Sequence, residues 1–269
     1  MTPLPKCLLA FALLFSPLIL VRAQTYGEEL NLGSQAYRNS HYEEAIEHFR
    51  KATELDPSKP VAHMYLATAY VGQYIPGVES PENVRMAEQA IAQYLMVLDS
   101  DSAGDSKPNA AKGVAYIYLN MKKFDEAKHY YQMASGFDPK DPEPYYSVGV
   151  IDWTLCYQPR MEARVRLKLP PEVQLDAKKP REKKVCDELV AKNMPWVAEG
   201  IESLSRAIEL RPDYDDAMAY MNLMLRERAD LECDDLAARQ RDLKAADDWV
   251  DKTLLTKKKK AEQMPSTQQ

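Results

Sequence analysis

Three cysteines outside the N-terminal segment are the side chains that could form a covalent bond with one another. Cys156 and Cys186 flank the least regular stretch of the sequence, and a disulfide between them would close a loop of about 30 residues. Such a bond would stabilise the fold by about 3–4 kcal/mol, because it restricts the unfolded chain. We take Cys156–Cys186 as the first expectation. A bond from either to Cys233 and three buried thiols both stay open, and an odd number leaves at least one thiol unpaired.

No motif in the sequence indicates a metal, a redox centre or a phosphate-binding loop. There is no C-x-x-C pair, and the four histidines (His41, His48, His63 and His129) are not spaced with carboxylates as metal ligands are. G-x-x-x-x-G-K-[ST], G-x-G-x-x-G, G-x-S-x-G and H-E-x-x-H are absent as well. A Cys–His nucleophile pair would need a histidine from a distant helix. We therefore expect no catalysis, no cofactor and no metal site.

The composition indicates a helical protein. The 269 residues include only 9 glycines against 18 prolines, and a β-sandwich or barrel needs more glycine for turns with positive φ. Tyrosine (16) outnumbers phenylalanine (5), so aromatic side chains with a polar end are common. The formal net charge is −6. This charge disfavours nucleic acid and anionic membranes as partners that bind through bulk charge.

The N-terminus has the pattern of a secretory signal. Lys6 supplies a positive charge, residues 7–21 are apolar but too few to span a bilayer comfortably, and Val21 and Ala23 are small residues where a signal peptidase cuts. We expect residues 1–23 to be removed and the protein to be exported, as a periplasmic or secreted chain without membrane insertion. An uncleaved N-terminal anchor is the alternative.

Three stretches, at 42–57, 124–139 and 197–212, share one helical pattern. Each has a small residue, a bulky residue four later, an alanine three after that, and a closing proline. This spacing places the small residue, the bulky residue and the alanine on one helix face, and the proline ends the helix. A weaker copy lies at 87–99. The shared positions are Ala45, Phe49, Ala52 and Pro57; Ala127, Tyr131, Ala134 and Pro139; Gly200, Leu204, Ala207 and Pro212.

A partner helix with a large–small pair, such as Leu32-Gly33 or Val148-Gly149, precedes the copies. The arrangement resembles the tetratricopeptide repeat, a 34-residue helix–turn–helix unit. The resemblance implies an all-α fold, a right-handed α-solenoid, and a non-catalytic scaffold that binds a protein or peptide. A non-repeating helical bundle is the alternative. The expected units are about 26–59, 60–99, 108–141, 142–214 and 215–258. The last is a partial repeat plus a C-terminal capping helix. Together they form a domain at 24–258, which a disordered tail at 259–269 follows.

A long insertion, residues 157–194, interrupts the fourth unit. Charged and apolar residues alternate over Arg164–Leu169, which predicts a short strand, and residues 181–193 suit a helix. The segment contains more lysine and arginine than acidic residues between Arg160 and Lys184. We expect either a binding loop laid over the concave groove of the array or a solvated excursion.

The resemblance also implies which residues line that groove. The inner positions of the first helices are transferred here to Tyr37 with Arg38 beside it, Lys112, Tyr116, Tyr146 and Trp153. Only Lys112 resembles part of the carboxylate clamp of family members that bind C-terminal tails. We therefore expect a peptide with apolar anchors, although Tyr146 and Trp153 could equally pack against the insertion or the next helix. The alternative function is a self-assembling or accessory subunit of an envelope complex.

Overall fold

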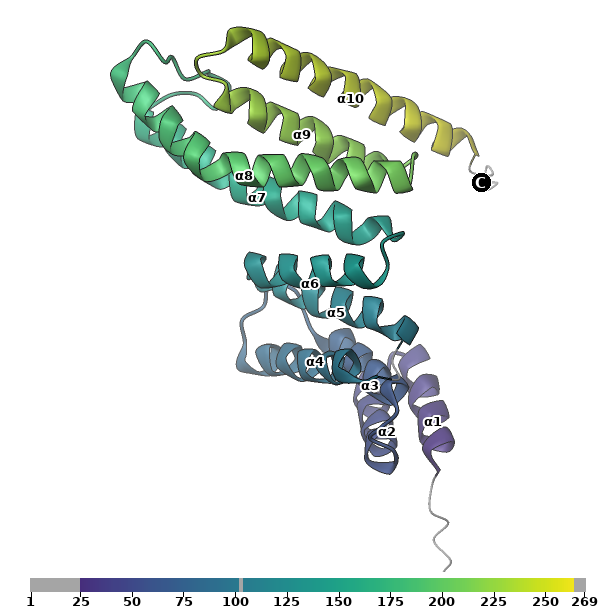
Figure 1. Cartoon of the computed structure of the whole chain (residues 1–269). Helices are drawn as coiled ribbons and strands as arrows, with labels where there is room; N and C mark the ends of the chain where they lie inside the picture. Colours follow the sequence, from purple (N-terminus) through teal and green to yellow (C-terminus); the bar gives the residue numbers. More distant parts are fainter. Residues whose placement is uncertain (1–24, 102–103, 264–269) are drawn as a thin grey trace, which may run out of the picture.

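The computed structural model describes residues 25–101 and 104–263. These residues form ten α-helices and one short 3-10 turn and contain no β-strand (Figure 1). The elements are α1 (Tyr26–Arg38), α2 (Tyr42–Leu55), α3 (Pro60–Gln73), α4 (Pro81–Asp99), η1 (Gly104–Ser106), α5 (Lys107–Asn120), α6 (Phe124–Phe137), α7 (Pro142–Leu167), α8 (Pro180–Leu210), α9 (Asp215–Leu231) and α10 (Leu236–Gln263).

The helix starts follow from local sequence. The Thr25 hydroxyl accepts the N–H of Glu28 at 3.3 Å, and the N–H of Thr25 donates to the Glu28 carboxylate at 2.9 Å, which caps α1 at both groups. Ser80 caps α4 by accepting the N–H of Asn83. Proline occupies the first or second position of α3, α4, α5, α7 and α8, where its missing N–H would have no intrahelical partner in any case.

Consecutive helices pack as pairs, from α1–α2 at one end of the molecule to α9–α10 at the other (Figure 1). The small–large pattern of the repeats lies at the pair interfaces. A Cβ on Gly149 of α7 would come within 2.5 Å of the Leu204 side chain of α8, and a Cβ on Gly33 would come within 2.6 Å of the Phe49 ring. The predicted repeat register is therefore confirmed as a pattern of close helix contact.

From the contacts at the two ends of the array, we infer that the odd-numbered helices form its inner layer. α1 contacts α3 and α7 contacts α9, whereas the even-numbered helices of the described chain contact one another less. The layer whose helices lie closer together is the concave side of a curved stack. We call the surface that α1, α3, α5, α7 and α9 present on this side the inner face.

The predicted insertion at 157–194 is not a separate loop. It consists of the second half of α7 and the first half of α8, joined by residues 168–179, so that this helix pair extends beyond the others. The strand predicted over Arg164–Leu169 is wrong. α7 continues to Leu167 and ends at Lys168, whose φ of 57° is left-handed. In a helix, side chains four residues apart lie on the same face. The alternation of charged and apolar residues in this stretch has a period of two, which is typical of a strand, and it hid the helical period.

The last helix is longer than the predicted cap and packs along α9 as the second helix of a fifth pair. It runs to Gln263, so the prediction of disorder is wrong for residues 259–263. Residues 264–269 lie outside the described part of the chain, as do residues 1–24 with the predicted signal. No helix in the described ranges combines the length and apolar character needed to cross a membrane.

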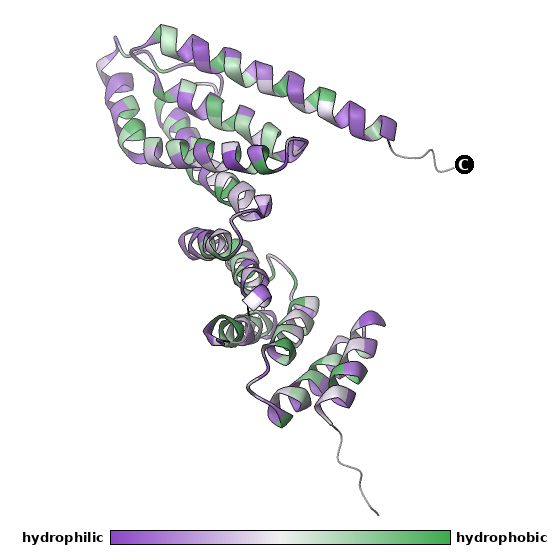
Figure 2. Cartoon of the chain, turned by 45° about the vertical axis from the view of Figure 1, so that its right-hand side comes forward, coloured by the Kyte–Doolittle hydropathy of each residue, from purple (hydrophilic) through white to green (hydrophobic). Residues whose placement is uncertain are grey.

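The buried face of α10 agrees with expectation in part. The sequence places five apolar side chains on the inner side of this helix, at Leu236, Leu243, Trp249, Val250 and Leu254. Leu243, Trp249 and Val250 are partly buried, whereas Leu236 and Leu254 are 63% and 60% exposed. Asp242, Ala246 and Thr253 are the buried residues of α10, and Trp249 packs against the core beside them. Hydrophilic residues predominate along this helix (Figure 2), as expected for the end of a stack that no further repeat covers.

Candidate functional site

Lys112 and Tyr116 lie one helical turn apart on α5. Lys112 Nζ donates to Asp141 Oδ2 at 2.8 Å and to Glu143 Oε2 at 3.0 Å, at the start of α7. Burial lowers the pKa of Lys112, but the two carboxylates more than offset this, and the pKa lies above its usual value. The lysine is therefore engaged within the chain. Tyr116 is 41% exposed and remains available for contact.

Tyr146 and Trp153 on α7 belong to a continuous row of aromatic rings on the inner face. Both contact Tyr220 of α9, with ring centroids 5.8 and 5.6 Å apart. Tyr214 lies 4.9 Å from Tyr146 at one end, and Tyr157 lies 5.1 Å from Trp153 at the other. We call these five residues the aromatic row. The structure thus joins two of the predicted groove residues through Tyr220 of α9, and Trp153 also contacts Tyr157, the first residue of the predicted insertion.

The aromatic row is partly open to solvent. Tyr157 is 37% exposed, Tyr214 is buried, and Tyr146, Trp153 and Tyr220 lie between these extremes. Burial raises the pKa of Tyr214 to about 12 and raises that of Tyr146 as well. The phenols therefore stay neutral near pH 7. Sequence reasoning did not select Tyr157, Tyr214 or Tyr220, because the groove positions were not transferred to the fifth unit.

Tyr37 and Arg38 lie at the other end of the array, in the last turn of α1. Tyr37 is half-buried, and its ring meets the edge of Tyr42 with centroids 5.4 Å apart. Arg38 is exposed. Because α1 belongs to the first pair and the aromatic row to the fourth and fifth, the structure does not bring all the predicted groove residues together. Only a ligand that runs along the array could contact both ends.

A row of polar side chains follows the buried side of α7. Asp152, Cys156, Arg160 and Arg164 are spaced four residues apart, which places them on one helix face. Asp152 is fully buried and accepts a hydrogen bond from Lys128 of α6 at 2.7 Å. Burial raises the pKa of Asp152 to about 7, although Lys128 opposes the shift.

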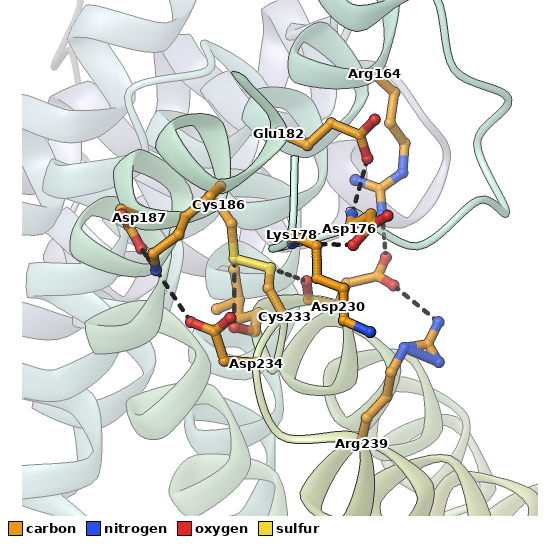
Figure 3. Close-up of a disulfide and its surroundings, with 12 residues drawn as sticks. Arg164, Asp176, Lys178, Glu182, Cys186, Asp187, Asp230, Cys233, Asp234 and Arg239 are labelled. Atoms are coloured by element: carbon orange, nitrogen blue, oxygen red, sulfur yellow. Dashed lines mark hydrogen bonds and ion pairs between the residues drawn. A yellow bond between two sulfur atoms is a disulfide. The ribbon is translucent and has the colours of Figure 1, made fainter. Parts of the chain in front are cut away.

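Asp230 of α9 joins three helices at the far end of this polar row (Figure 3). Arg160 and Arg164 of α7 each donate to Asp230 Oδ2 at 2.9 Å, and Arg239 of α10 lies 3.7 Å from Oδ1. Arg160 also pairs with Glu227 at 3.0 Å. Burial raises the pKa of Glu227 to about 7. Sequence reasoning missed this cluster because it ended the α7 helix before Arg160.

The disulfide connects Cys186 of α8 to Cys233, which lies between α9 and α10 (Figure 3). The expected Cys156–Cys186 bond is wrong. Cys156 packs beside Asn193 of α8, whose carbonyl oxygen is 3.7 Å from the thiol sulfur. Because an α-helix rises 1.5 Å per residue, Cys186 lies about 10 Å farther along α8, too far from Cys156 for a disulfide. Cys156 is a buried free thiol, and burial raises its pKa to about 12, so it is protonated and unreactive near pH 7.

Much of the positive charge of residues 157–194 is paired within the chain. Arg166 donates to Glu188 at 2.8 Å, and Lys183 donates to Asp234 at 3.0 Å, in addition to the two arginines at Asp230. This region therefore offers less free positive charge to a ligand than its sequence indicates.

Two of the histidines have partners inside the array. His48 Nδ1 lies 2.7 Å from the carboxylate of buried Glu29, and His63 Nδ1 lies 2.7 Å from the amide oxygen of Gln93. Over the part of the chain that the structure describes, no three histidine, cysteine or acidic side chains come together as metal ligands would.

Two sequence models of the tetratricopeptide repeat match the chain, one described as a TPR repeat over residues 33–73 and one as a tetratricopeptide repeat over 113–141. No curated protein matches the chain in sequence.

The fold is similar to that of several solved structures, among them two of MamA and one of YrrB. A crystal structure of MamA protein shares 14% identity at a TM-score of 0.57 and covers 91% of this chain and 98% of its own. MamA 41-end from Desulfovibrio magneticus RS-1 shares 14% identity at a TM-score of 0.54, and the match covers 90% of this chain and 99% of that one. YrrB, described as a TPR protein with an unusual peptide-binding site, shares 15% identity at a TM-score of 0.51, and the match covers 86% of this chain and 91% of that one. At these identities the likeness is one of fold. The two matched repeats and this succession of helix pairs show that the chain contains tetratricopeptide repeats and has the fold of a TPR solenoid.

Proposed function

We propose that the chain is a non-catalytic interaction scaffold whose inner face binds a segment of another protein. The aromatic row of α7 and α9 is the observation that carries this proposal. Tyrosine and tryptophan provide large, rigid contact areas at a low cost in side-chain entropy, which is why they dominate the binding energy of many interfaces. Exposed Tyr116 on α5 extends the same face toward the middle of the array.

The ligand that this face favours is an extended or helical segment with apolar side chains. Lys112, which alone resembled a carboxylate clamp, already holds Asp141 and Glu143, so a C-terminal carboxylate would have to compete with two internal ones. The tyrosines are neutral near pH 7 and can donate hydrogen bonds to a peptide backbone. The peptide-binding site named for YrrB supports a peptide as the ligand class. The net charge of −6 favours a protein over a nucleic acid.

We also propose that the protein is exported and acts outside the cytoplasm. The apolar run at 7–21 and the small residues before Gln24 support signal cleavage. The disulfide between Cys186 and Cys233 supports an oxidising compartment, because disulfides persist there and are rare in the cytosol. N-terminal sequencing of the protein from its native cells should read from Gln24. An N-terminus at Met1 would contradict the proposal.

Site-specific photocrosslinking tests the proposed binding face. A photoreactive amino acid is placed at Tyr116 or Tyr157 on the inner face, and at Phe137 of α6 as the control. Phe137 is 44% exposed, close to the 41% and 37% of the two test positions. We expect the same partner to crosslink from the two inner positions and not from the control. Crosslinks of equal yield from all three positions, or from Phe137 alone, would contradict the proposal.

A further inference from the structure

The loop between α3 and α4, which lengthens the second repeat, is held by one buried side chain. Asn83, in the first turn of α4, is 6% exposed. Its Oδ1 accepts the N–H of Ile75 at 2.7 Å, and its Nδ2 donates to the carbonyl oxygens of Ile75 and Val78 at 2.8 and 2.6 Å. Three hydrogen bonds from one side chain fix the loop backbone, so the loop presents its side chains in a defined arrangement.

This fixed loop exposes aliphatic side chains next to an apolar pocket. Ile75 is 59% exposed and Val78 is 44% exposed, and water contact with such groups costs free energy that an interface would recover. A pocket of about 310 Å³ opens beside them. Its apolar lining comes from Tyr74, Val78, Val84, Ala87 and Met121.

The rim of the same pocket holds one acidic and one basic side chain. Glu79 comes from the loop and Lys122 from the turn between α5 and α6. Both are exposed, and neither side chain makes an ion pair or hydrogen bond within the described residues. One face of the molecule thus combines a protruding aliphatic residue, an apolar pocket, and two charges of opposite sign that are free to pair.

We propose that this face is a self-complementary surface through which two copies of the chain associate about a two-fold axis. Each copy would insert its Ile75 into the pocket of the other, and Glu79 of each would meet Lys122 of the other. In a two-fold interface every contact occurs twice, so a surface must match itself in shape and in charge. The rim charges meet this condition, whereas a binding site for a single acidic or basic ligand would carry one sign.

The association should be weak and reversible. The surface comprises the 74–80 loop and the end of α5, fewer than the roughly 20–30 residues on each side of a standard stable interface. It lies on the first half of the array and leaves the aromatic row of α7 and α9 uncovered. The inference therefore does not depend on the proposed function, and either can fail without the other.

Sedimentation equilibrium of the purified protein, in a concentration series reaching about 1 mM at low salt, tests the proposal. We expect a monomer–dimer equilibrium whose dissociation constant rises at least about tenfold in Ile75→Asp. Val61→Asp is the matched control, because Val61 is a 42% exposed aliphatic residue on α3, and it should leave the equilibrium unchanged. A wild-type protein that stays monomeric throughout, as it would if the pocket served a foreign partner, would overturn the proposal.

Charge reversal tests the two-fold geometry itself. Glu79→Lys and Lys122→Glu should each weaken association, because each places like charges opposite one another. Mixing the two variants should restore it in mixed dimers, and so should the double variant, since opposite charges face each other again in both. If Ile75→Asp weakens association but neither combination restores it, the copies meet in another arrangement and the proposed interface is wrong. Circular dichroism of each variant confirms that the helices remain folded.

Discussion

Lys112 of α5 donates from Nζ to the carboxylate of Asp141 at 2.8 Å, immediately before α7. This pair connects the third helix pair of the array to the fourth across the inner face. The lysine that the repeat register assigns to a ligand thus contributes to the stability of the stack, and the binding surface that remains is aromatic.

Lys112→Met should therefore lower stability more than an exposed lysine change does. The substitution keeps the aliphatic stem but leaves Asp141 and Glu143 without their counter-charge, and we expect the free energy of unfolding to fall by about 1–2 kcal/mol. Lys59→Met is the control, since Lys59 pairs with Asp56 at 3.3 Å while 52% exposed, and its effect should stay within about 0.5 kcal/mol. Urea unfolding measures both, and equal effects would contradict the structural role.

Gly149→Ala should destabilise the fourth pair. The new Cβ would come within 2.5 Å of Leu204, which is fully buried, and overpacking of this kind costs about 1–3 kcal/mol. Gly136→Ala in α6 is the matched control, because nothing lies within 4 Å of its Cβ position. There the better helix propensity of alanine should raise stability by up to about 1 kcal/mol. Opposite shifts in the thermal unfolding midpoint are expected, and a stabilised Gly149→Ala protein would disprove the close contact.

Breaking the disulfide should cost stability without removing the fold. Cys186 and Cys233 are 47 residues apart, and opening a loop of that length corresponds to about 4 kcal/mol in the chain-entropy account. We expect reductant to lower the unfolding midpoint of the wild type and to leave Cys186→Ser/Cys233→Ser unaffected. Titration of the denatured, unreduced protein should find the thiol of Cys156, plus Cys7 only where the signal segment is retained. A midpoint insensitive to reductant would exclude the bond.

The raised pKa values of Asp152 and Glu227 predict that the free energy of unfolding falls as the pH rises from about 4 to about 7. Both carboxyls hold a proton up to about pH 7 when folded and release it near pH 4 when unfolded. Unfolding in this window therefore releases protons, and higher pH favours the unfolded chain. Each group contributes at most about 1.4 kcal/mol per pH unit.

Asp152→Asn isolates one of these two groups. The amide keeps the shape of the side chain and cannot titrate, so the wild type should lose stability relative to the variant between pH 5 and pH 7. Urea unfolding at both pH values measures the difference. A gap in unfolding free energy that is the same at both would show that Asp152 does not titrate in this range.

The repeat register could be predicted because it reflects steric necessity. A small residue such as Gly149 must face a bulky one such as Leu204 wherever two helices approach closely, and that requirement leaves the same pattern in every unit. The same register assigns Tyr146 and Trp153 to the groove, and that assignment stays a prediction. Their partner Tyr220 was not predicted, because the groove positions of the register were not transferred to the helix at 215–230.

The extended α7–α8 pair could not be predicted for a different physical reason. Pro159 and Pro195 lie inside these helices, where proline removes a hydrogen bond and normally ends the helix. The tertiary contacts of the long pair override that local preference. With α7 taken as broken, Cys156 and Arg164 had no common helix face, so neither the disulfide partner of Cys186 nor the cluster at Asp230 could be inferred.

The affinity of a crosslinked partner segment for variants of the inner face tests the central claim most directly. The segment is made as a synthetic peptide, and its dissociation constant is measured for the wild type, for Tyr116→Ala/Tyr157→Ala and for Phe137→Ala. We predict at least about tenfold weaker binding for the inner-face variant and no change for the Phe137 variant. Equal affinity of all three proteins would contradict an aromatic binding face on the inner layer.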